Sequence, residues 1–423
     1  MRVRLLVIVS AMALASAGCT GSDGSFEGTA ERATIPNEML LLGTEAGPLV
    51  VSVPEGSVQF EREGSVASLG GGWVLSARGS KGSTNLLTRD DATGETFSTD
   101  GLPGGLEARV VSETGRAVAL TEPLPGGWDP RVPLPRSRTT IVVADPTGER
   151  EPVTFHLLGN YEPEAFSSDD ERLFLIQHLP ADTPRVYRVT VLNLDRGRVR
   201  PVFGPFKGEP ERMPGIRLQQ TISPAGDHLY TLYSSARPGY VPHGAAGPGD
   251  AVVSFVHVLS LDENWAHCVG LPQGMWDRPA SAQAMTTSPD GERLYVVDAG
   301  RGTIAMMDTN SLETTEIEAD FEAPATIERT TSTVSPDGET LFVATAGHGV
   351  SFVSAIDVDS FDVATAWRHD GRVSGLGLSA DGGRLYVAVG GRLSVLDART
   401  GESIGQTVID APDEVRSILP IGA

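Results

Sequence analysis

The sequence predicts an all-β protein that folds as a single β-propeller of four-stranded blades. Three observations carry this prediction. A turn motif recurs along most of the chain, and a second turn motif follows each copy of the first. A third is the abundance of turn-forming residues, since the chain has 49 Gly and 29 Pro. The hydrophobic content of 40% is sufficient for a core, which argues against a disordered chain.

The first turn motif reads Ser-Pro-Asp-Gly and is followed, after two residues, by Leu and an aromatic residue. Each copy precedes alternating or apolar residues, so we expect one strand to end, the chain to reverse and a second strand to return. Clear and weaker copies begin, 44 to 65 residues apart, at Ser68, Ser112, Ser167, Ser223, Ser288, Ser335 and Ser379.

The second turn motif is a short alternating strand that ends on a turn, in most copies with Asp. Two coupled turns imply four strands per unit, and a repeating four-stranded unit of about 40–50 residues is typical of a propeller blade. The seven copies lie at residues 86–95, 141–149, 191–198, 253–262, 305–313, 355–362 and 394–402.

The pattern Ser-Pro-Asp-Gly-x-x-Leu-Tyr-Val resembles the YVTN-type β-propeller repeat, a relative of the Trp-Asp-repeat propellers. The resemblance covers roughly residues 66–410 and is strongest in the last three units. It implies a propeller but no catalytic residue, because the motif is structural. The family includes surface-layer-like proteins, lactonases and subunits of periplasmic dehydrogenases, so the fold leaves the function open.

The two ends of the repeat region supply further strands. Residues 39–44, 49–53 and 58–60 have strand character before the first unit, and residues 414–420 have it after the last. We expect them to combine into one composite blade that closes the ring, because closure removes exposed strand edges. Seven internal units and this blade give eight blades. The alternative is a seven-bladed ring overlaid by the N-terminal strands.

The first residues are typical of an export signal. Arg2 and Arg4 precede an apolar run, 5–15, that is too short to span a bilayer. The following Ser-Ala-Gly-Cys resembles the end of a bacterial lipoprotein signal, in which the cysteine, here Cys19, is lipidated and becomes the new N-terminus. Cleavage after Ala17, which releases a secreted protein, is the alternative.

These features divide the chain into three parts. We expect a lipoprotein signal peptide over residues 1–18, a flexible tether over 19–37 and the propeller over 38–423. The protein is then exported and anchored by lipid to the outer face of the bacterial cell membrane. If Cys19 is lipidated, Cys268 has no disulfide partner and is expected to be a small buried apolar residue.

Four insertions interrupt the repeats. Residues 121–138 and 234–251 separate the second and third strands of their units, whereas 203–217 and 272–283 join one unit to the next. In a four-stranded blade these two kinds of connection lie on the same face, so we expect all four insertions on one face of the ring. Loops mounted on a rigid scaffold are where binding concentrates.

The insertions contain aromatic residues beside charged ones. Such groups suit recognition of a glycan, a peptide or a protein surface; the alternative for each residue is that it anchors its own long loop. The candidate binding residues are Trp128, Asp129, Arg131, Tyr240, His243, Trp276, Asp277 and Arg278.

The sequence contains no G-x-S-x-G, H-E-x-x-H, C-x-x-C or phosphate-binding glycine motif, so we predict no catalytic residue, metal site or cofactor. A net charge of −22 argues against binding to nucleic acid. We favour a noncatalytic, membrane-tethered binding or scaffold protein of the cell envelope, with an envelope protein or a glycan as its partner. The alternatives are a lactonase- or lyase-like enzyme with its site in the channel, and a partner subunit of a periplasmic redox complex.

Overall fold

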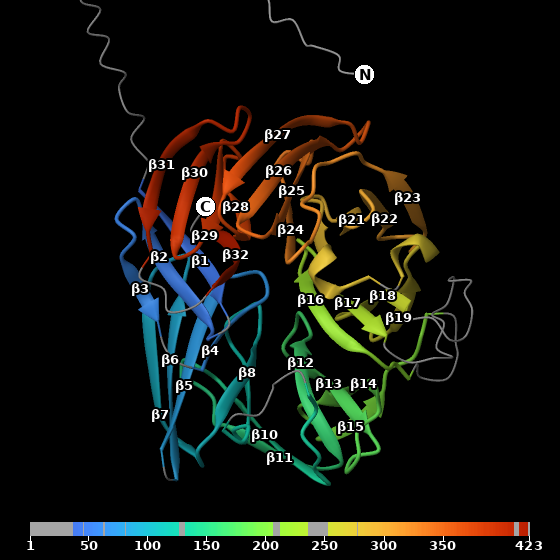
Figure 1. Cartoon of the computed structure of the whole chain (residues 1–423). Coiled ribbons are helices and arrows are strands. Elements are labelled where there is room, and N and C mark those ends of the chain that lie inside the picture. Colours follow the sequence, from blue (N-terminus) through green and yellow to red (C-terminus); the bar gives the residue numbers. More distant parts are fainter. Residues whose placement is uncertain are drawn as a thin grey trace, which may run out of the picture. The chain divides into compact units, whose positions relative to one another are not determined.

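The computed structural model describes residues 37–421, apart from residues 45, 62–63, 81, 127–131, 206–211, 236–252, 277 and 410–413. All of them belong to one compact unit, Thr34–Ala423. Its described part contains eight four-stranded antiparallel sheets, which follow one another round a ring in sequence order (Figure 1). The predicted eight-bladed all-β propeller is confirmed, and the seven-bladed alternative is wrong.

Seven blades are continuous in sequence, and each runs from an inner strand beside the central channel to an outer strand. Blade 1 consists of β4 (Ser65–Ala67), β5 (Trp73–Ser80), β6 (Ser83–Asp90) and β7 (Thr96–Pro103). Blade 2 consists of β8 (Glu107–Val111), β9 (Val118–Thr121), β10 (Arg138–Ala144) and β11 (Val153–Leu158). Blade 3 consists of β12 (Asn160–Phe166), β13 (Arg172–Leu179), β14 (Val186–Asn193) and β15 (Arg198–Pro201). Blades 4 and 5 consist of β16 (Ile216–Ile222), β17 (His228–Ser235), β18 (Val253–Ser260) and β19 (Ala266–Gly270); and β20 (Gln283–Thr287), β21 (Arg293–Asp298), β22 (Thr303–Asp308) and β23 (Thr314–Glu318). Blades 6 and 7 consist of β24 (Arg329–Val334), β25 (Thr340–Gly347), β26 (Val350–Asp357) and β27 (Val363–Asp370); and β28 (Val373–Leu378), β29 (Arg384–Val389), β30 (Arg392–Asp397) and β31 (Ser403–Val408).

The eighth blade is built from both ends of the described chain, as the sequence predicts. From the channel outward its strands are β32 (Val415–Ile421), β1 (Glu38–Thr44), β2 (Pro48–Val53) and β3 (Val58–Glu61). β1 pairs antiparallel with β32, with Leu41 opposite Leu419. Main-chain hydrogen bonds between the two ends of the chain therefore close the ring.

The first turn motif links the inner strand to the second strand in all seven continuous blades. In the copy that begins at Ser288, the Ser288 hydroxyl donates to the Asp290 carboxylate, which also accepts the N–H of Glu292. The Ser288 Oγ in turn accepts the N–H of Arg293 at 2.9 Å. The side chains of the motif thus satisfy the polar groups of their own turn.

The proline and glycine of the motif also pack neighbouring blades together. Gly382 has a φ of +70°, and a Cβ at this position would come within 3.0 Å of the Pro336 ring in the preceding blade. Only glycine combines this backbone conformation with so close an approach. The recurrence of the motif therefore reflects contacts between blades as well as the turn within each blade.

The apolar core lies in layers between facing sheets. The aromatic residues of the first motif, such as Tyr295 and Tyr386, are fully buried in these layers. Tyr386 of blade 7 packs in one cluster with Leu40 and Ile418 of the composite blade. Cys268 is buried in another layer, as predicted.

The ring closure leads to a first prediction. Ile418 is 3% exposed, and we expect Ile418→Ala to lower the free energy of unfolding by about 2–5 kcal/mol, because it leaves a cavity between the composite blade and blade 7. The adjacent Leu419 is 39% exposed, so Leu419→Ala should cost less than about 1 kcal/mol. Urea unfolding followed by circular dichroism measures both. Equal losses would show that closure does not depend on this packing.

Candidate functional site

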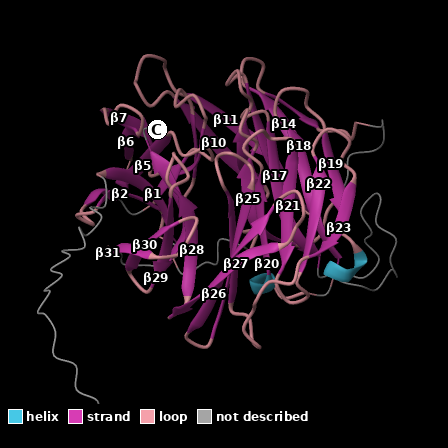
Figure 2. Cartoon of the chain, turned by 90° about the horizontal axis from the view of Figure 1, so that it is seen from above, coloured by secondary structure: helices cyan, strands magenta, loops and turns pink. Residues whose placement is uncertain are grey.

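The connections between strands divide between the two faces of the ring. Both repeated turn motifs lie on one face, which we name the turn face. The connections from second to third strands and from one blade to the next lie on the other, which we name the insertion face. Each of the four predicted insertions joins a second to a third strand or one blade to the next, so all four belong to the insertion face. Two 3₁₀ turns in the fourth insertion, η1 (Gln273–Met275) and η2 (Ala280–Ala282), lie at the same end of the strands in Figure 2.

Most of the candidate binding residues lie outside the described residues, as does the predicted lipidation site, Cys19. The structure places two of the eight, Trp276 and Arg278. The other six are Trp128, Asp129, Arg131, Tyr240, His243 and Asp277.

Trp276 and Arg278 both attach the fourth insertion to the body of the ring. Trp276 is 5% exposed and donates its indole N–H to the Leu271 carbonyl at 2.9 Å. Arg278 Nε lies 3.5 Å from an oxygen of Asp298, a fully buried side chain at the end of β21. Burial raises the pKa of the Asp298 carboxyl, and the charge of Arg278 opposes this effect. These contacts favour loop anchoring over exposed recognition for both residues.

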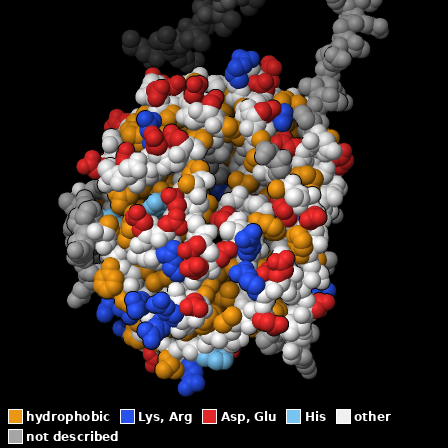
Figure 3. Space-filling model, turned by 180° about the vertical axis from the view of Figure 1, so that it is seen from behind, with side chains coloured by type: hydrophobic (Ala, Val, Ile, Leu, Met, Phe, Trp, Pro, Cys, Tyr) orange, Lys and Arg blue, Asp and Glu red, His pale blue; other side chains and the backbone are white. Residues whose placement is uncertain are grey.

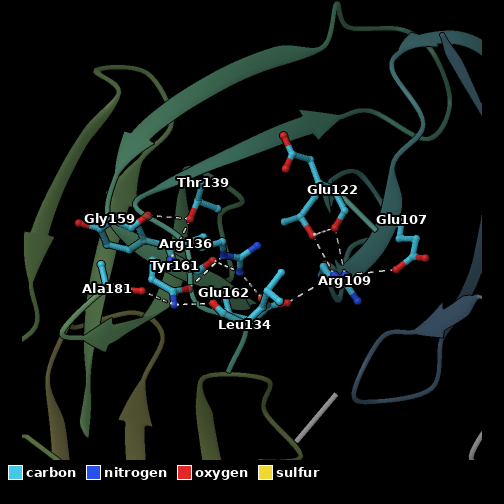
Figure 4. A network of polar contacts seen from close by, with 12 residues as sticks. Glu107, Arg109, Glu122, Leu134, Arg136, Thr139, Gly159, Tyr161, Glu162 and Ala181 are labelled. Atoms are coloured by element: carbon cyan, nitrogen blue, oxygen red, sulfur yellow. Dashed lines mark hydrogen bonds and ion pairs between the residues drawn. The ribbon is translucent and has the colours of Figure 1, made fainter. Parts of the chain in front are cut away.

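A group of charged contacts, drawn in Figure 4, lies near the starts of the inner strands β8 and β12. Inner strands begin on the insertion face, and we name this end of the central channel the channel mouth. Glu162 on β12 pairs with Arg136 Nη2 at 2.7 Å and with Arg109 Nε at 3.4 Å. Arg109 belongs to the neighbouring inner strand β8 and also pairs with Glu107 at 3.2 Å. The arginines therefore connect blades 2 and 3 through a shared carboxylate.

Arg136 lies in the insertion 121–138 and fixes its described end to the inner strand. Its Nε donates to the Asn160 side-chain carbonyl at 3.0 Å, and its Nη2 donates to the Tyr161 carbonyl at 2.7 Å. With the Glu162 contact, these bonds occupy two nitrogens of the guanidinium. The Arg136 guanidinium thus attaches the insertion to β12 through three hydrogen bonds.

A second group of contacts joins blades 3 and 4 at the same mouth. Glu164 on β12 is 5% exposed at its side chain and pairs with Arg217 Nη1 of β16 at 3.2 Å. Gln220 Nε2 donates to the other Glu164 oxygen at 2.6 Å. Burial raises the pKa of the Glu164 carboxyl, and the charge of Arg217 opposes this effect. The side chain of Arg217 is 52% exposed, so the pair has one buried and one accessible member.

His178 lies at the insertion-face end of β13, where the charges of an arginine from each group act on its pKa. Burial lowers its pKa to about 4, and the charges of Arg136 and Arg217 act in the same direction. Its ring meets that of Tyr187 edge-on at 6.3 Å. The imidazole is therefore neutral at physiological pH. We name His178 and the residues of the two groups (Glu107, Arg109, Arg136, Glu162, Glu164, Arg217 and Gln220) the mouth network.

The mouth network is absent from the candidates that the sequence suggests, although the sequence holds a signal for it. The stretch 160–166 (NYEPEAF) precedes a turn motif and must form an inner strand, yet it contains two glutamates. Charged residues inside a predicted inner strand require partners on the neighbouring blades. Chemically, the network offers guanidinium donors and carboxylate acceptors at the channel mouth, a combination suited to a polar ligand or surface.

The turn face has a different electrostatic character. The turns of its seven continuous blades carry 26 Asp and Glu against 8 Arg, a net charge of −18, compared with −22 for the whole chain. Figure 3, the view of the ring from behind, shows acidic side chains spread over this face around a central hollow, with arginines gathered in places among them. The turns counted are 68–73, 112–117, 167–172, 223–228, 288–293, 335–340 and 379–384, and 90–95, 145–151, 193–198, 260–265, 308–313, 357–362 and 397–402.

Many of these turn carboxylates are engaged by their own turns. Hydrogen bonds from the Ser288 hydroxyl and the Glu292 N–H lower the pKa of Asp290, and the N–H of Ser311 does the same for Asp308. Within the described ranges, no group of three or more His, Cys, Asp or Glu is placed to hold a metal ion, and no helix is long and apolar enough to cross a membrane.

No family model matches the chain, and no curated protein matches it. Similar solved structures include apo AztD from Citrobacter koseri, at 13% identity and a TM-score of 0.55, covering 92% of this chain and 99% of that one. Another is the dihydro-heme d1 dehydrogenase NirN in complex with DHE, at 14% identity and a TM-score of 0.54, covering 95% and 78%. At such identities the likeness shows the propeller fold alone.

His178 gives a prediction with a defined sign. Its pKa falls from 6.5 to about 4 on folding, so between these values the unfolded chain binds a proton that the folded chain does not. Stability should therefore fall as the pH drops from 6.5 to 4, and His178→Gln should remove up to about 3 kcal/mol of that fall. Urea unfolding at pH 7 and pH 4.5 measures the difference.

The matched control is His348→Gln, whose parent side chain is 72% exposed on the same face. It removes an exposed imidazole, so the difference between the two variants isolates the contribution of the buried one. If His178→Gln keeps the wild-type dependence of stability on pH, His178 does not titrate as its surroundings imply.

Proposed function

We propose that this protein is a noncatalytic binding or scaffold propeller of the cell envelope, tethered to the membrane by a lipid on Cys19, and that it binds an envelope protein or a glycan through its insertion face. The observation that carries the proposal is the contrast between the two faces. On the turn face, the repeated motifs satisfy their own polar groups. At the channel mouth, Arg217 keeps half of its side chain accessible beside a buried carboxylate.

The point where the tether leaves the ring supports this assignment of faces. β1 begins at Glu38, which pairs with Arg384 at 3.2 Å and also accepts a hydrogen bond from the Tyr386 hydroxyl. Arg384 ends a turn motif, so β1 starts at the turn face. The described chain therefore begins on the face opposite the insertions. A tether attached there would leave the insertion face accessible to a partner.

Partner capture tests the proposed binding face. Arg217→Gln removes the accessible guanidinium at the mouth, and we expect it to reduce capture of envelope components by the full chain about tenfold. Arg196→Gln removes an exposed arginine from a turn of the turn face and should leave capture unchanged. Quantitative mass spectrometry of the bound fraction measures both, with thermal unfolding to confirm that each variant folds. Equal capture by the two variants would contradict binding at the mouth.

Lipid labelling tests the tether independently of any partner. The full chain should incorporate a radiolabelled fatty acid in a bacterial host, and Cys19→Ala should lose the label. Cys268→Ala is the matched control and should keep it, because Cys268 is buried in the ring. Label that persists in Cys19→Ala would show that the lipid is attached elsewhere or that the signal is of another type.

A second candidate function is that of an enzyme with its site in the channel, and one observation supports it. Burial raises the pKa of Glu164 and lowers that of His178 within the same network, and opposed shifts of this kind are frequent at acid–base sites. However, Arg217 and Gln220 already engage both oxygens of Glu164. If the wild-type chain hydrolyses a lactone and Glu164→Gln abolishes this activity, the enzyme function would replace the binding proposal.

A further inference from the structure

Two arginines from successive inner strands lie at another part of the channel mouth. Arg329 is the first residue of β24 in blade 6, and Arg372 directly precedes β28 in blade 7. Arg329 Nε donates to the carbonyl of Ser374 at 2.8 Å, so its side chain reaches across to β28, the strand that follows Arg372. Arg372 Nη2 pairs with Glu414, next to β32, at 2.7 Å.

The main chain around both arginines is held in place. The Ser351 hydroxyl donates to the carbonyl of Gly371 at 2.8 Å and accepts the N–H of Val373 at 2.9 Å, which fixes the chain on both sides of Arg372. The N–H of Glu328, next to Arg329, donates to the carbonyl of Ala346 at 2.8 Å. The two side chains therefore start from fixed positions.

Among the described residues, few carboxylates form ion pairs with these cations. Among the residues that the structure describes, no carboxylate lies within ion-pair distance of Arg329, and Glu414 is the only one within that distance of Arg372. Burial lowers the pKa of the Arg329 guanidinium; Glu414 opposes this effect and the nearby charge of Arg372 adds to it. Within the described part of the chain, Glu414 therefore pairs with Arg372 and acts on Arg329 only through its charge.

Within the described residues, both guanidiniums also keep N–H groups that make no hydrogen bond or ion pair. Arg329 donates through Nε alone, to a carbonyl, within the described part of the chain. Arg136, by contrast, uses two nitrogens in three bonds, including one to a carboxylate. An arginine that serves only to join blades is expected to resemble Arg136. Planar guanidiniums with free N–H groups match carboxylate and phosphate oxygens in geometry and charge.

We propose that Arg329 and Arg372 form an oxyanion site at the channel mouth, which binds a carboxylate or phosphate group of a soluble ligand. The charge distribution supports this position, because the net charge of −18 on the turn face repels anions from the other end of the channel. The site lies on blades 6 and 7, separate from the mouth network on blades 2 to 4. It does not depend on the identity of any macromolecular partner.

Anion titrations of the full chain test the site. Inorganic phosphate and acetate are the probes, with sodium chloride at equal ionic strength as the reference, and isothermal titration calorimetry gives the affinities. We expect at least one oxyanion to bind more tightly than chloride. Arg329→Gln should weaken that binding roughly 10- to 100-fold, and Arg372→Gln about tenfold.

The matched control is Arg392→Gln, which removes an exposed arginine from another connection of the insertion face, at the start of β30. It should leave the affinity unchanged. Binding of phosphate and acetate no tighter than that of chloride would overturn the proposal, as would an equal loss of affinity in Arg392→Gln.

Stability without added oxyanion separates binding from a structural role. Arg329→Gln removes a half-buried cation that lacks its own carboxylate, so its unfolding temperature in chloride should equal or exceed that of the wild type. An arginine needed only for packing would instead give a less stable variant with unchanged oxyanion affinity, which would overturn the proposal. If Arg329→Gln does not fold, Arg372→Gln carries the test, because its parent side chain is 43% exposed.

Discussion

The pairing of β1 with β32 is the interaction on which the rest of the ring depends. Every blade buries both of its faces against neighbours, so a gap at one position exposes two apolar layers. The composite blade fills that position: Leu40 and Ile418 pack towards blade 7, whereas Leu41 and Val50 pack with Val74 of blade 1. Main-chain bonds between strands from the two ends of the chain hold this blade together, so its stability is tied to that of the whole ring.

Ring closure also determines where polar chemistry gathers. All inner strands start on the insertion face, so their first residues meet around one channel mouth. Side chains there contact the next blade and water at the same time, which allows charged residues that the apolar layers exclude. Glu164 and Arg217 show the outcome, since the carboxylate is buried between blades and its guanidinium partner remains accessible. Arg329 is likewise close to the start of its inner strand, as the first residue of β24 in blade 6.

The fold was largely predictable because its signals are local. The bonds of the Ser288 motif join residues at most five apart, so one short stretch of sequence contains all of them. The mouth network was not predictable in detail, because its bonds join different blades: Arg217 and Glu164 are 53 residues apart. Trp276 shows a third limit, since the sequence alone does not distinguish an aromatic residue on a loop surface from one that anchors the loop.

The unequal charge of the two faces follows from the same architecture. A turn motif that uses Asp to bind its own N–H groups adds a negative charge each time it recurs, so repetition makes the turn face acidic without any demand from a ligand. No such repetition acts at the channel mouth, where each inner strand begins with different residues. The repeat therefore does not fix which residues stand at the channel mouth. The negative charge of the turn face therefore mainly reflects the number of blades, whereas the arginines beside the channel do not follow from the repeat.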